Sequence, residues 1–307
     1  MLDLTVIILT FNEAKHLQRC LNSVAQIAKT IIVVDSGSTD QTCEIARRFG
    51  ARIYYHSFKH QAAQLQWALL SCPIHTQWVL RLDADEYIEI ELNQEIQQRL
   101  PNLAPEIHGI FLKRKQYFLG KWIRYGNRYP LILLRLWRHQ SVILEQRWMD
   151  EHILLIEGQG IIFEHHFIDD NQQDIFAFIQ KHQHYANREM LDLINQKYQL
   201  ELSHFYINNL TDQQIKTQRI LKQNYYNKSP LFIRAILYFI YRYFIKLGFL
   251  DGWIGLLYHF IQGFYYRCLV DIQYFKAAWR LRYLPQKKAK IIYLIQLTGL
   301  PVEGSDE

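Results

Sequence analysis

Short apolar runs alternate with amphipathic stretches along the first hundred residues of the chain. Runs typical of buried strands lie at residues 4–9, 30–34, 52–55 and 78–82. Helices are predicted between them at residues 14–25, 38–49 and 61–70, and the second of these begins with the capping-box pattern Ser38 to Gln41. Strands that alternate with helices in this way indicate parallel βαβ units and an α/β fold.

Polar residues follow three of the predicted strands at their carboxyl ends. Thr10-Phe11-Asn12 ends the first strand, Asp35 ends the second, and Asp83-Ala84-Asp85 ends the fourth. Ligands of parallel sheets bind at these ends, near a point where the strand order reverses. In extended backbone Asp83 and Asp85 would point to the same side, and two such charges need a cation or a basic partner. Carboxylate ligands favour Mg²⁺ or Mn²⁺.

The alternation fades after residue 100. Residues 108–138 have a mixed strand pattern with turns at Gly120 and Gly126, and residues 172–223 are polar and helical. The last third is nearly all apolar or aromatic at 231–247 and 252–266, but it carries scattered basic residues. Neither stretch has the roughly 20 predominantly apolar residues of a spanning helix.

Two interpretations of this last third are open. The first is amphipathic helices in a membrane interface, with aromatic residues at headgroup depth: Trp253, Tyr258, Phe264, Tyr265 and Tyr266. A following basic segment would attract anionic lipid: Arg280, Arg282, Lys287, Lys288 and Lys290. The second interpretation is a helical hairpin packed on the catalytic domain or on a second subunit.

The amino-acid composition limits the kinds of partner that the protein is expected to bind. The 307 residues carry a formal net charge of +6, which suits an anionic partner such as nucleotide-sugar phosphates or an acidic membrane face. No nucleic-acid-binding module accompanies this charge, so we expect no nucleic-acid partner. The four cysteines have no C-x-x-C spacing and favour reduced thiols. The chain opens directly on a strand without a leader pattern, so a cytoplasmic location is expected.

Three motifs resemble glycosyltransferase family 2, whose members adopt the GT-A fold. They are Val6-Ile7-Ile8-Leu9-Thr10-Phe11-Asn12-Glu13, Ile32-Val33-Val34-Asp35-Ser36-Gly37-Ser38-Thr39-Asp40 and Leu80-Arg81-Leu82-Asp83-Ala84-Asp85-Glu86. Trp148-Met149-Asp150-Glu151-His152 is similar to the acceptor-side motif of a bacterial branch that makes lipopolysaccharide core or exopolysaccharide. Gly248-Phe249-Leu250-Asp251-Gly252 is also similar to that branch.

The resemblance implies a mixed, mainly parallel sheet flanked by helices, followed by a C-terminal amphipathic helical region. We expect a catalytic domain over residues 1–225, with a nucleotide-sugar half (1–100) and an acceptor half (101–225). A membrane-associating region is expected over 226–307.

The nucleotide contacts are expected at the strand ends. A uracil-like ring offers an N–H donor that Asp35 is suited to accept, and the resemblance places the backbone of Thr10 and Phe11 in the same slot with Glu13 near the ribose. Two alternatives stay open: the Asp35 loop only caps the next helix, and Asn12 with Glu13 only caps the first.

The family resemblance also implies a divalent cation, Mg²⁺ or Mn²⁺, with Asp85 as direct ligand and Asp83 on the ribose or on metal-bound water. Ala84 lies between the two. Gln64 stands where the family often has a polar group facing the nucleotide, although a solvated helix face explains it equally well.

A transfer reaction needs a base for the acceptor hydroxyl. Glu151 is the first candidate and Asp150 the second, against the alternative of a surface acidic pair. His165 and His166 follow an apolar strand, where structural roles are expected. Eight basic residues between the motif regions either hold phosphate or are solvated: Lys113, Arg114, Lys115, Lys121, Arg124, Arg128, Arg135 and Arg138.

Taken together, the sequence predicts an inverting, metal-dependent glycosyltransferase that uses a nucleotide-sugar donor, with UDP expected, and a glycan or glycolipid acceptor at the cytoplasmic face of the inner membrane. The inverting outcome follows from the resemblance. A non-catalytic membrane scaffold is one alternative. A sugar-phosphate nucleotidyltransferase is another, but it needs a glycine-rich loop that Thr10-Phe11-Asn12-Glu13 does not provide.

Overall fold

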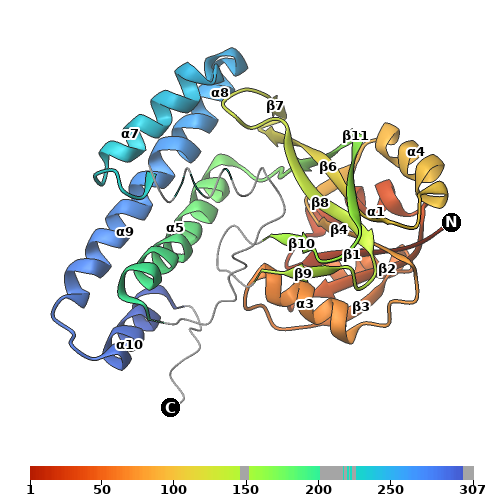
Figure 1. Cartoon of the computed structure of the whole chain (residues 1–307), viewed down its shortest axis with the longest axis horizontal. Helices are drawn as coiled ribbons and strands as arrows, with labels where there is room; N and C mark the ends of the chain where they lie inside the picture. The colour runs from red at the N-terminus through yellow and green to blue at the C-terminus, as the bar shows by residue number, and fades with distance from the viewer. Residues whose placement is uncertain (146–151, 201–216, 218–219, 221, 223–225, 300–307) are drawn as a thin grey trace. The chain divides into compact units, whose positions relative to one another are not determined.

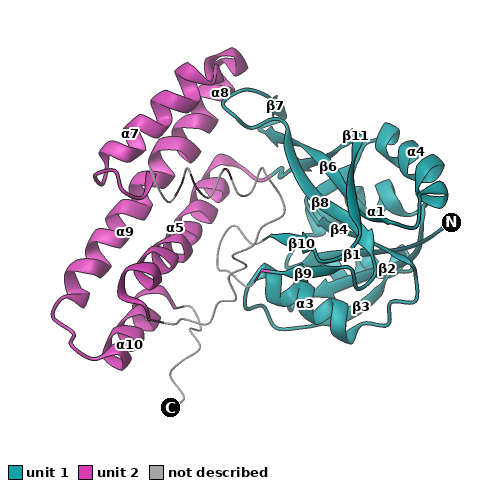
Figure 2. Ribbon diagram, viewed as in Figure 1, with its two compact units in different colours: residues 1–144, 152–172 teal, residues 145–151, 173–307 magenta. Residues whose placement is uncertain are grey.

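The structure is a computed structural model that describes residues 1–145, 152–200, 217, 220, 222 and 226–299. It divides into two compact units, residues 1–144 with 152–172 and residues 145–151 with 173–307 (Figure 2). This division falls earlier than residue 225, where the sequence places the end of the catalytic domain. The functional boundary at residue 225 stays a prediction.

Unit 1 is built on a mixed sheet (Figure 1). Its first four strands are parallel and confirm the predicted positions: β1 (Leu2–Thr10), β2 (Ala28–Asp35), β3 (Arg52–Tyr55) and β4 (Trp78–Asp83). Later strands extend it: β5 (Glu86–Ile88), β6 (Ile107–Phe118), β7 (Lys121–Ile123), β8 (Leu131–Arg138) and β11 (Gln159–Asp170). The order is β3-β2-β1-β4-β8-β6-β11-β5, with β7 paired to β6. A separate ribbon pairs β9 (Val142–Leu144) with β10 (Ile153–Leu155).

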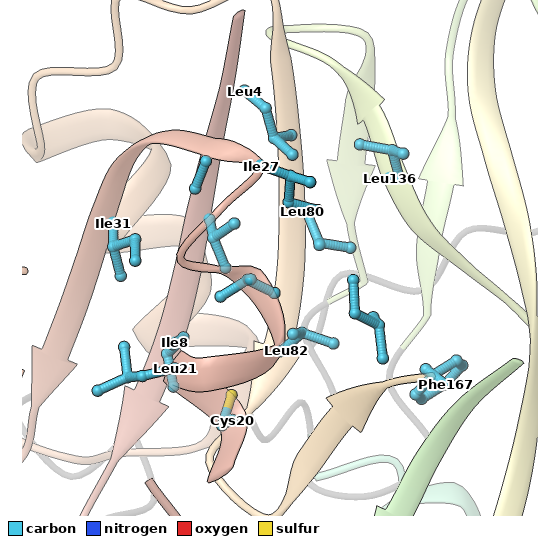
Figure 3. Packing of buried hydrophobic residues seen from close by; sticks show 14 of the residues in the cluster. Leu4, Ile8, Cys20, Leu21, Ile27, Ile31, Leu80, Leu82, Leu136 and Phe167 are labelled. Atoms are coloured by element: carbon cyan, nitrogen blue, oxygen red, sulfur yellow. The ribbon is translucent and has the colours of Figure 1, made fainter. Parts of the chain in front are cut away.

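Helices cover both faces of this sheet, because alternate residues of its central strands are apolar on both sides. Leu4, Val6 and Ile8 of β1 pack in one cluster with α1 (Ala14–Val24), α2 (Thr42–Arg48) and α4 (Ile90–Arg99), the last continued by the short helix η1 (Leu100–Asn102). Ile7 packs in the other cluster with α3 (Gln61–Ser71). Figure 3 shows Cys20 and Leu21 of α1 gathered with Ile8 and Leu82 in the first cluster. The predicted α/β class is confirmed.

Two local expectations are wrong. The second helix begins at Thr42 rather than Ser38. Its N-cap residue Gln41 forms no side-chain capping bond, the Ser38 hydroxyl is bonded to Asp35, and the Asp40 carboxylate accepts from the Thr42 N–H. Ala84 and Asp85 form a turn between β4 and β5, so they do not continue the extended backbone that would point Asp83 and Asp85 to one side.

Unit 2 is helical in its described part. Its elements are α5 (Ile175–Tyr198), α7 (Ile233–Ile240), the π-helical turn η3 (Tyr241–Ile245), the 3₁₀ turn η4 (Gly248–Asp251), α8 (Gly252–His259), the π-helical turn η5 (Phe260–Tyr265), α9 (Tyr266–Leu281) and α10 (Lys287–Thr298). Buried Glu189 of α5 accepts hydrogen bonds from Tyr266 and from Arg267, the latter at 2.7 Å, which ties α5 to α9.

No single described helix of the chain has the length and apolar composition to cross a bilayer. One bent pair, Ile233–Ile245 with Gly248–Leu281, meets both criteria when the two are taken together, with a bend of 71° between them. The turn that joins them has no room for larger residues: a Cβ on Gly255 would lie 2.3 Å from Cβ of Asp251, and one on Gly248 would lie 2.9 Å from the carbonyl oxygen of Arg242.

Candidate active site

The carboxyl ends of β1, β2 and β4 form one edge of the sheet. Thr10 pairs with Asp35 across β1 and β2, and Leu9 pairs with Asp83 across β1 and β4. The chain runs outward from β1 to β3 and then returns to place β4 on the other side of β1, so the strand order reverses between β1 and β4. The predicted position of Thr10, Asp35 and Asp83 at a switch-point edge is therefore confirmed.

Asp35 organises the loop that follows β2. Its Oδ1 accepts from the hydroxyls of Thr10 (3.0 Å) and Ser38 (2.5 Å), and its Oδ2 accepts from the backbone N–H groups of Gly37 (2.9 Å) and Ser38 (2.8 Å). Burial alone would raise the pKa of Asp35, but these bonds outweigh it and the pKa is lowered. A carboxylate has about four accepting sites, and here the chain's own donors use four.

The loops after β1 and β2 are bonded to each other. The Asn12 side chain accepts from the Thr39 N–H at 2.8 Å, the Asn12 N–H donates to Ser38 Oγ at 2.8 Å, and Asn12 adopts a left-handed φ of 54°. The Glu13 N–H donates to Thr42 Oγ1 at 2.8 Å, while the Glu13 carboxylate contacts His16 at 2.6 Å. Neither side chain forms a capping bond at the start of α1, so the capping alternative is wrong. Phe11 stands out from this loop with 57% of its surface exposed.

Gln64 supports the same loop from α3. Its amide donates to Ser36 Oγ at 2.9 Å and to the His56 carbonyl at 3.0 Å, and its oxygen contacts His56 Nδ1 at 2.8 Å. Its side chain is buried, so the alternative of a solvated face is wrong. The His56 ring in turn stacks on Trp67, with centroids 4.6 Å apart. These contacts of Gln64 and His56 stabilise the loop that follows Asp35. Exposed Tyr55, which was not predicted from the sequence, pairs with Asp35 across β2 and β3.

The two aspartates of the β4–β5 turn have different partners. Asp83 Oδ1 accepts from Arg81 Nη2 at 3.0 Å, so an arginine offsets its charge. Asp85 Oδ2 accepts from the Asn171 amide at 3.0 Å, and the Asp85 carbonyl accepts from the Asp170 N–H at 3.1 Å. The end of β11 therefore positions the turn that carries Asp85. No pattern in the sequence points to a role for Asn171.

A buried ion pair lies next to this turn. Glu86 Oε1 accepts from Arg135 Nη2 at 2.6 Å, and Glu86 Oε2 accepts from the Asp83 N–H at 2.9 Å. Both Glu86 and Arg135 are buried. The register of β8 against β6 shifts by one residue at Arg135, since Ile110 pairs with Leu136 and Phe111 pairs with Leu134. Such a bulge redirects a side chain, and here it accompanies the contact of Arg135 with Glu86.

The ionisation of these groups follows from their burial. Burial raises the pKa of Glu86, and the charges of Asp83 and Asp169 add to this effect while Arg135 opposes it. The Cys20 thiol, 3.7 Å from the Asp83 carbonyl, has its pKa held well above the usual range by burial and then by Glu86, Asp85 and Asp83. The turn therefore has a negative environment at its inner side.

The residues present fit a hard divalent cation. Asp85 offers carboxylate oxygens at the carboxyl edge of the sheet, and two further acidic residues, Asp83 and Glu86, lie next to it in the chain. In the part of the chain that is described, no group of three His, Cys, Asp or Glu residues would hold a metal by itself. Mg²⁺ and Mn²⁺ commonly bind through one or two carboxylates and complete their shell with substrate phosphates, which suits such a site.

Four of the eight residues of the basic cluster are bonded within the chain. Arg114 lies 3.2 Å from Asp169, Lys115 lies 2.6 Å from Glu89, and Arg138 donates to the Ile107 carbonyl at 2.8 Å. With Arg135 bonded to Glu86, the alternative of scattered solvated charges is wrong for these four residues.

The two histidines have structural partners, as expected. His165 contacts buried Glu95 at 2.9 Å, and His166 contacts the Tyr129 hydroxyl at 2.7 Å and Glu89 at 3.2 Å. The candidate bases Asp150 and Glu151 lie outside the described residues, so their role stays a prediction.

Fold and site define a doubly wound α/β domain with an acidic ligand edge at its switch point. Residues 5–149 match the family model described as Glycosyl transferase family 2. This match confirms, over residues 5–149, the resemblance to glycosyltransferase family 2 that the sequence predicted.

Relatives with this domain occur in several bacteria. An uncharacterized glycosyltransferase of Rickettsia bellii is 39% identical over 94 residues, which is 31% of each chain. LpsC, a lipopolysaccharide core biosynthesis glycosyltransferase of Rhizobium meliloti, is 32% identical over 127 residues, or 39% of this chain and 44% of LpsC. The chain thus covers less than half the length of these relatives.

A solved structure of glucosyl-3-phosphoglycerate synthase from Mycobacterium tuberculosis, in complex with Mn²⁺, UDP and glucosyl-3-phosphoglycerate, superposes on 37% of this chain and 44% of its own. The TM-score is 0.31 and the identity 20%, so this similarity carries no ligand assignment.

We expect Asp35→Asn to lower the free energy of unfolding by about 1–3 kcal/mol at neutral pH, because a neutral amide replaces a carboxylate that accepts four hydrogen bonds. The folded pKa of Asp35 is lowered. Its stabilising contribution is therefore present above the unfolded value of about 3.9 and is lost as the pH falls through the folded pKa. Urea unfolding at a series of pH values measures both effects.

The matched control for Asp35→Asn is Glu44→Gln, which makes the same chemical change at an exposed helical carboxylate. A loss for Asp35→Asn no larger than that of this control at neutral pH would contradict the role given to Asp35.

Burial raises the pKa of Glu86 to about 8. At a pH above this value, Arg135→Met should lower the free energy of unfolding by about 3–5 kcal/mol, because it leaves the buried Glu86 carboxylate without its cation. The double variant Glu86→Met with Arg135→Met should recover most of this loss, since it removes both charges. Chemical denaturation of the three proteins tests the pair. Arg48→Met, which breaks an exposed ion pair with Glu44, is the control and should cost less than about 1 kcal/mol. A double variant as unstable as Arg135→Met would show that the charge is not the cause.

Proposed function

We propose that this protein transfers a sugar from a nucleotide-sugar donor, with UDP as the nucleotide, to a glycan or glycolipid acceptor of the bacterial cell envelope. The observation that carries the proposal is the edge formed by Thr10, Asp35 and Asp83 at the strand-order reversal of a family 2 domain. The lipopolysaccharide core activity in the name of LpsC supports an envelope glycan as acceptor.

The nucleoside is proposed to bind over the loops after β1 and β2. Asp35 accepts from the base N–H when the Thr10 or Ser38 hydroxyl turns away, and Thr10 has a second acceptor in the Val34 carbonyl at 3.5 Å. Exposed rings at the ends of β1 and β3, Phe11 and Tyr55, offer apolar surface for the base on either side of this loop. Glu13 is proposed to reach the ribose.

The diphosphate is proposed to lie over the β4–β5 turn. Asp85 would hold Mg²⁺ or Mn²⁺ there, and the cation would stabilise the negative charge of the leaving diphosphate. Asn171 positions Asp85, and Asp83 with Arg81 at 3.0 Å is proposed to contact the ribose or metal-bound water. Glu86 fixes this turn through the Asp83 N–H and is itself fixed by Arg135.

Glu151 is proposed to take the proton of the acceptor hydroxyl as it attacks the sugar carbon opposite the leaving group, with Asp150 as the second choice. Attack on that side gives inversion. Because the proposed acceptor is attached to a membrane, we place the protein at the cytoplasmic face of the inner membrane as a peripheral protein.

A non-catalytic scaffold is the alternative from another class. It predicts that Asp85 and Glu151 are dispensable for every biochemical property of the protein. A nucleotidyltransferase is less favoured, since β1 leads into Phe11-Asn12-Glu13, without a glycine to cradle a triphosphate.

Asp85→Asn should weaken manganese-dependent UDP binding by about tenfold to a hundredfold, because it removes a charged metal ligand. Calorimetric titration of UDP with Mn²⁺, and again with a chelator, measures the metal-dependent part. Asp3→Asn is the control, because Asp3 is an exposed carboxylate at the opposite end of β1. Metal-dependent UDP affinity unchanged from wild type would refute the assignment of Asp85.

Glu151→Gln should lower the turnover number by about 10² to 10⁴-fold while UDP affinity stays unchanged, because a general base acts only on the acceptor. Asp150→Asn should have a smaller effect. Turnover is followed as UDP release from UDP-sugars in the presence of an envelope glycan extract. A larger loss of turnover in Asp150→Asn than in Glu151→Gln would make Asp150 the base. Full activity of both variants would favour the non-catalytic scaffold.

A further inference from the structure

Residues 232–260 form a helical hairpin in which charged residues are buried and large apolar residues are exposed. In a helical pair surrounded by water, apolar residues pack inside and charged residues face out. Here Arg234, Arg242, Asp251 and His259 are buried. The exposed large residues of this fully described stretch are apolar or aromatic: Phe232, Ile233, Ile236, Leu237, Ile240, Tyr241, Phe244, Ile245, Leu247, Phe249, Leu250, Trp253, Leu256 and Phe260. Lys246 is its one exposed charged residue.

The buried charges of the hairpin have partners within unit 2. Arg234 Nε donates to Asp271 Oδ1 at 2.8 Å, and Asp271 Oδ2 accepts from the Phe232 N–H at 2.7 Å. Arg242 Nη1 donates to Gln262 Oε1 at 2.9 Å, and its guanidinium lies over the rings of Tyr238 and Tyr258. Ionised groups that are paired in this way tolerate surroundings of low polarity on the outside of the helices.

The exposed charges of the chain between residues 226 and 299 have one sign. Asp251 and Asp271 are the two acidic residues between 226 and 299, and both are buried. The exposed charged residues over the same range are all basic: Lys228, Lys246, Lys276, Arg280, Arg282, Lys287 and Lys288. On α9 they alternate with exposed Phe275 and Trp279. An exposed apolar surface, on a segment whose exposed charges are all basic, complements a bilayer with anionic headgroups.

We infer that the hairpin inserts its exposed face into one leaflet of an anionic membrane, with Lys246 and the basic residues of α9 and α10 at the headgroups. Long basic side chains reach the headgroups from an apolar position. A second copy of this chain fits the surface less well, because a two-fold contact would bring its cations against one another. The inference deepens the membrane location in the proposed function, but it rests on unit 2 and not on transfer chemistry.

Two of the aromatic residues expected at headgroup depth, Tyr258 and Tyr266, are buried. Tyr258 is 1% and Tyr266 is 6% exposed, so both face the inside of unit 2. Trp253 is 71% exposed, as predicted, and Phe244 at 55% is a residue that the sequence pattern did not single out. Phe264 and Tyr265 are half-buried.

The test is flotation of the full-length protein with vesicles of phosphatidylcholine, with and without phosphatidylglycerol. Wild type should float with the anionic vesicles. The double variant Phe244→Gln with Trp253→Gln should lose at least about tenfold in partition coefficient, because two large apolar side chains no longer enter the lipid. Leu70→Gln, at a 77% exposed leucine of unit 1, is the matched control and should float like wild type. Far-UV circular dichroism melting shows whether each variant is folded.

Insertion depth is measured with lipids brominated near the top of their acyl chains. These lipids should quench wild-type tryptophan fluorescence, and Trp253→Phe should lose most of that quenching. Absence of flotation with anionic vesicles would overturn the inference. So would a double variant that floats like wild type, or one whose only change is conversion of a lipid-free dimer to a monomer in sedimentation equilibrium. UDP binding by the same preparations is scored separately, so that vesicle binding without UDP binding would count against the proposed function alone.

Discussion

The parallel pairing of β1 with both β2 and β4 is the constraint on which the site depends. This register sets Thr10 beside Asp35 and Leu9 beside Asp83. Neighbouring strands in a sheet lie about 4.8 Å apart, so the backbones of Asp35 and Asp83, on either side of β1, are about 10 Å apart. A slip of one residue would turn every side chain of β1 to the other face and bring polar Thr5 and Thr10 into positions now filled by apolar residues. Packing on both faces of β1 opposes such a slip.

The carboxylates at this edge are held largely by the chain itself. Asp35 is bonded to its own loop, Asp40 accepts from the N–H groups of Ala14 and Thr42, and Asp83 faces Arg81. These bonds join the loops after β1 and β2 before any ligand arrives. Binding then costs less conformational entropy, although a ligand that contacts Asp35 must displace a hydroxyl that already satisfies it.

Much of unit 1 could be predicted from the sequence because its central strands are continuous apolar runs, and such runs are recognised without knowledge of their partners. The polar strand ends followed from the same pattern. The start of α2 could not be predicted, because Ser38 has a competing partner in Asp35, which is close only once β1 and β2 are paired. Arg135 was one of the eight basic residues between positions 113 and 138, and nothing in the sequence set it apart from the other seven. Its special role arises from a one-residue register shift between β8 and β6, which has no local signature.

The hairpin of residues 232–260 is a second feature that could be predicted only in part from the sequence. Its composition predicted contact with a membrane or a subunit, but composition does not reveal which residues face outward. In the sequence, Arg234 and Arg242 are charges on an apolar segment, and they counted against a helix that spans the membrane. Their partners Asp271 and Gln262 lie on the following helical segment, and pairing across the turn removes both arginines from the surface. The close approach at Gly248 and Gly255 permits that pairing, because a side chain at either position would overlap the turn. Because this turn allows both arginines to be buried, it determines whether the outer face of the hairpin is better suited to lipid or to water.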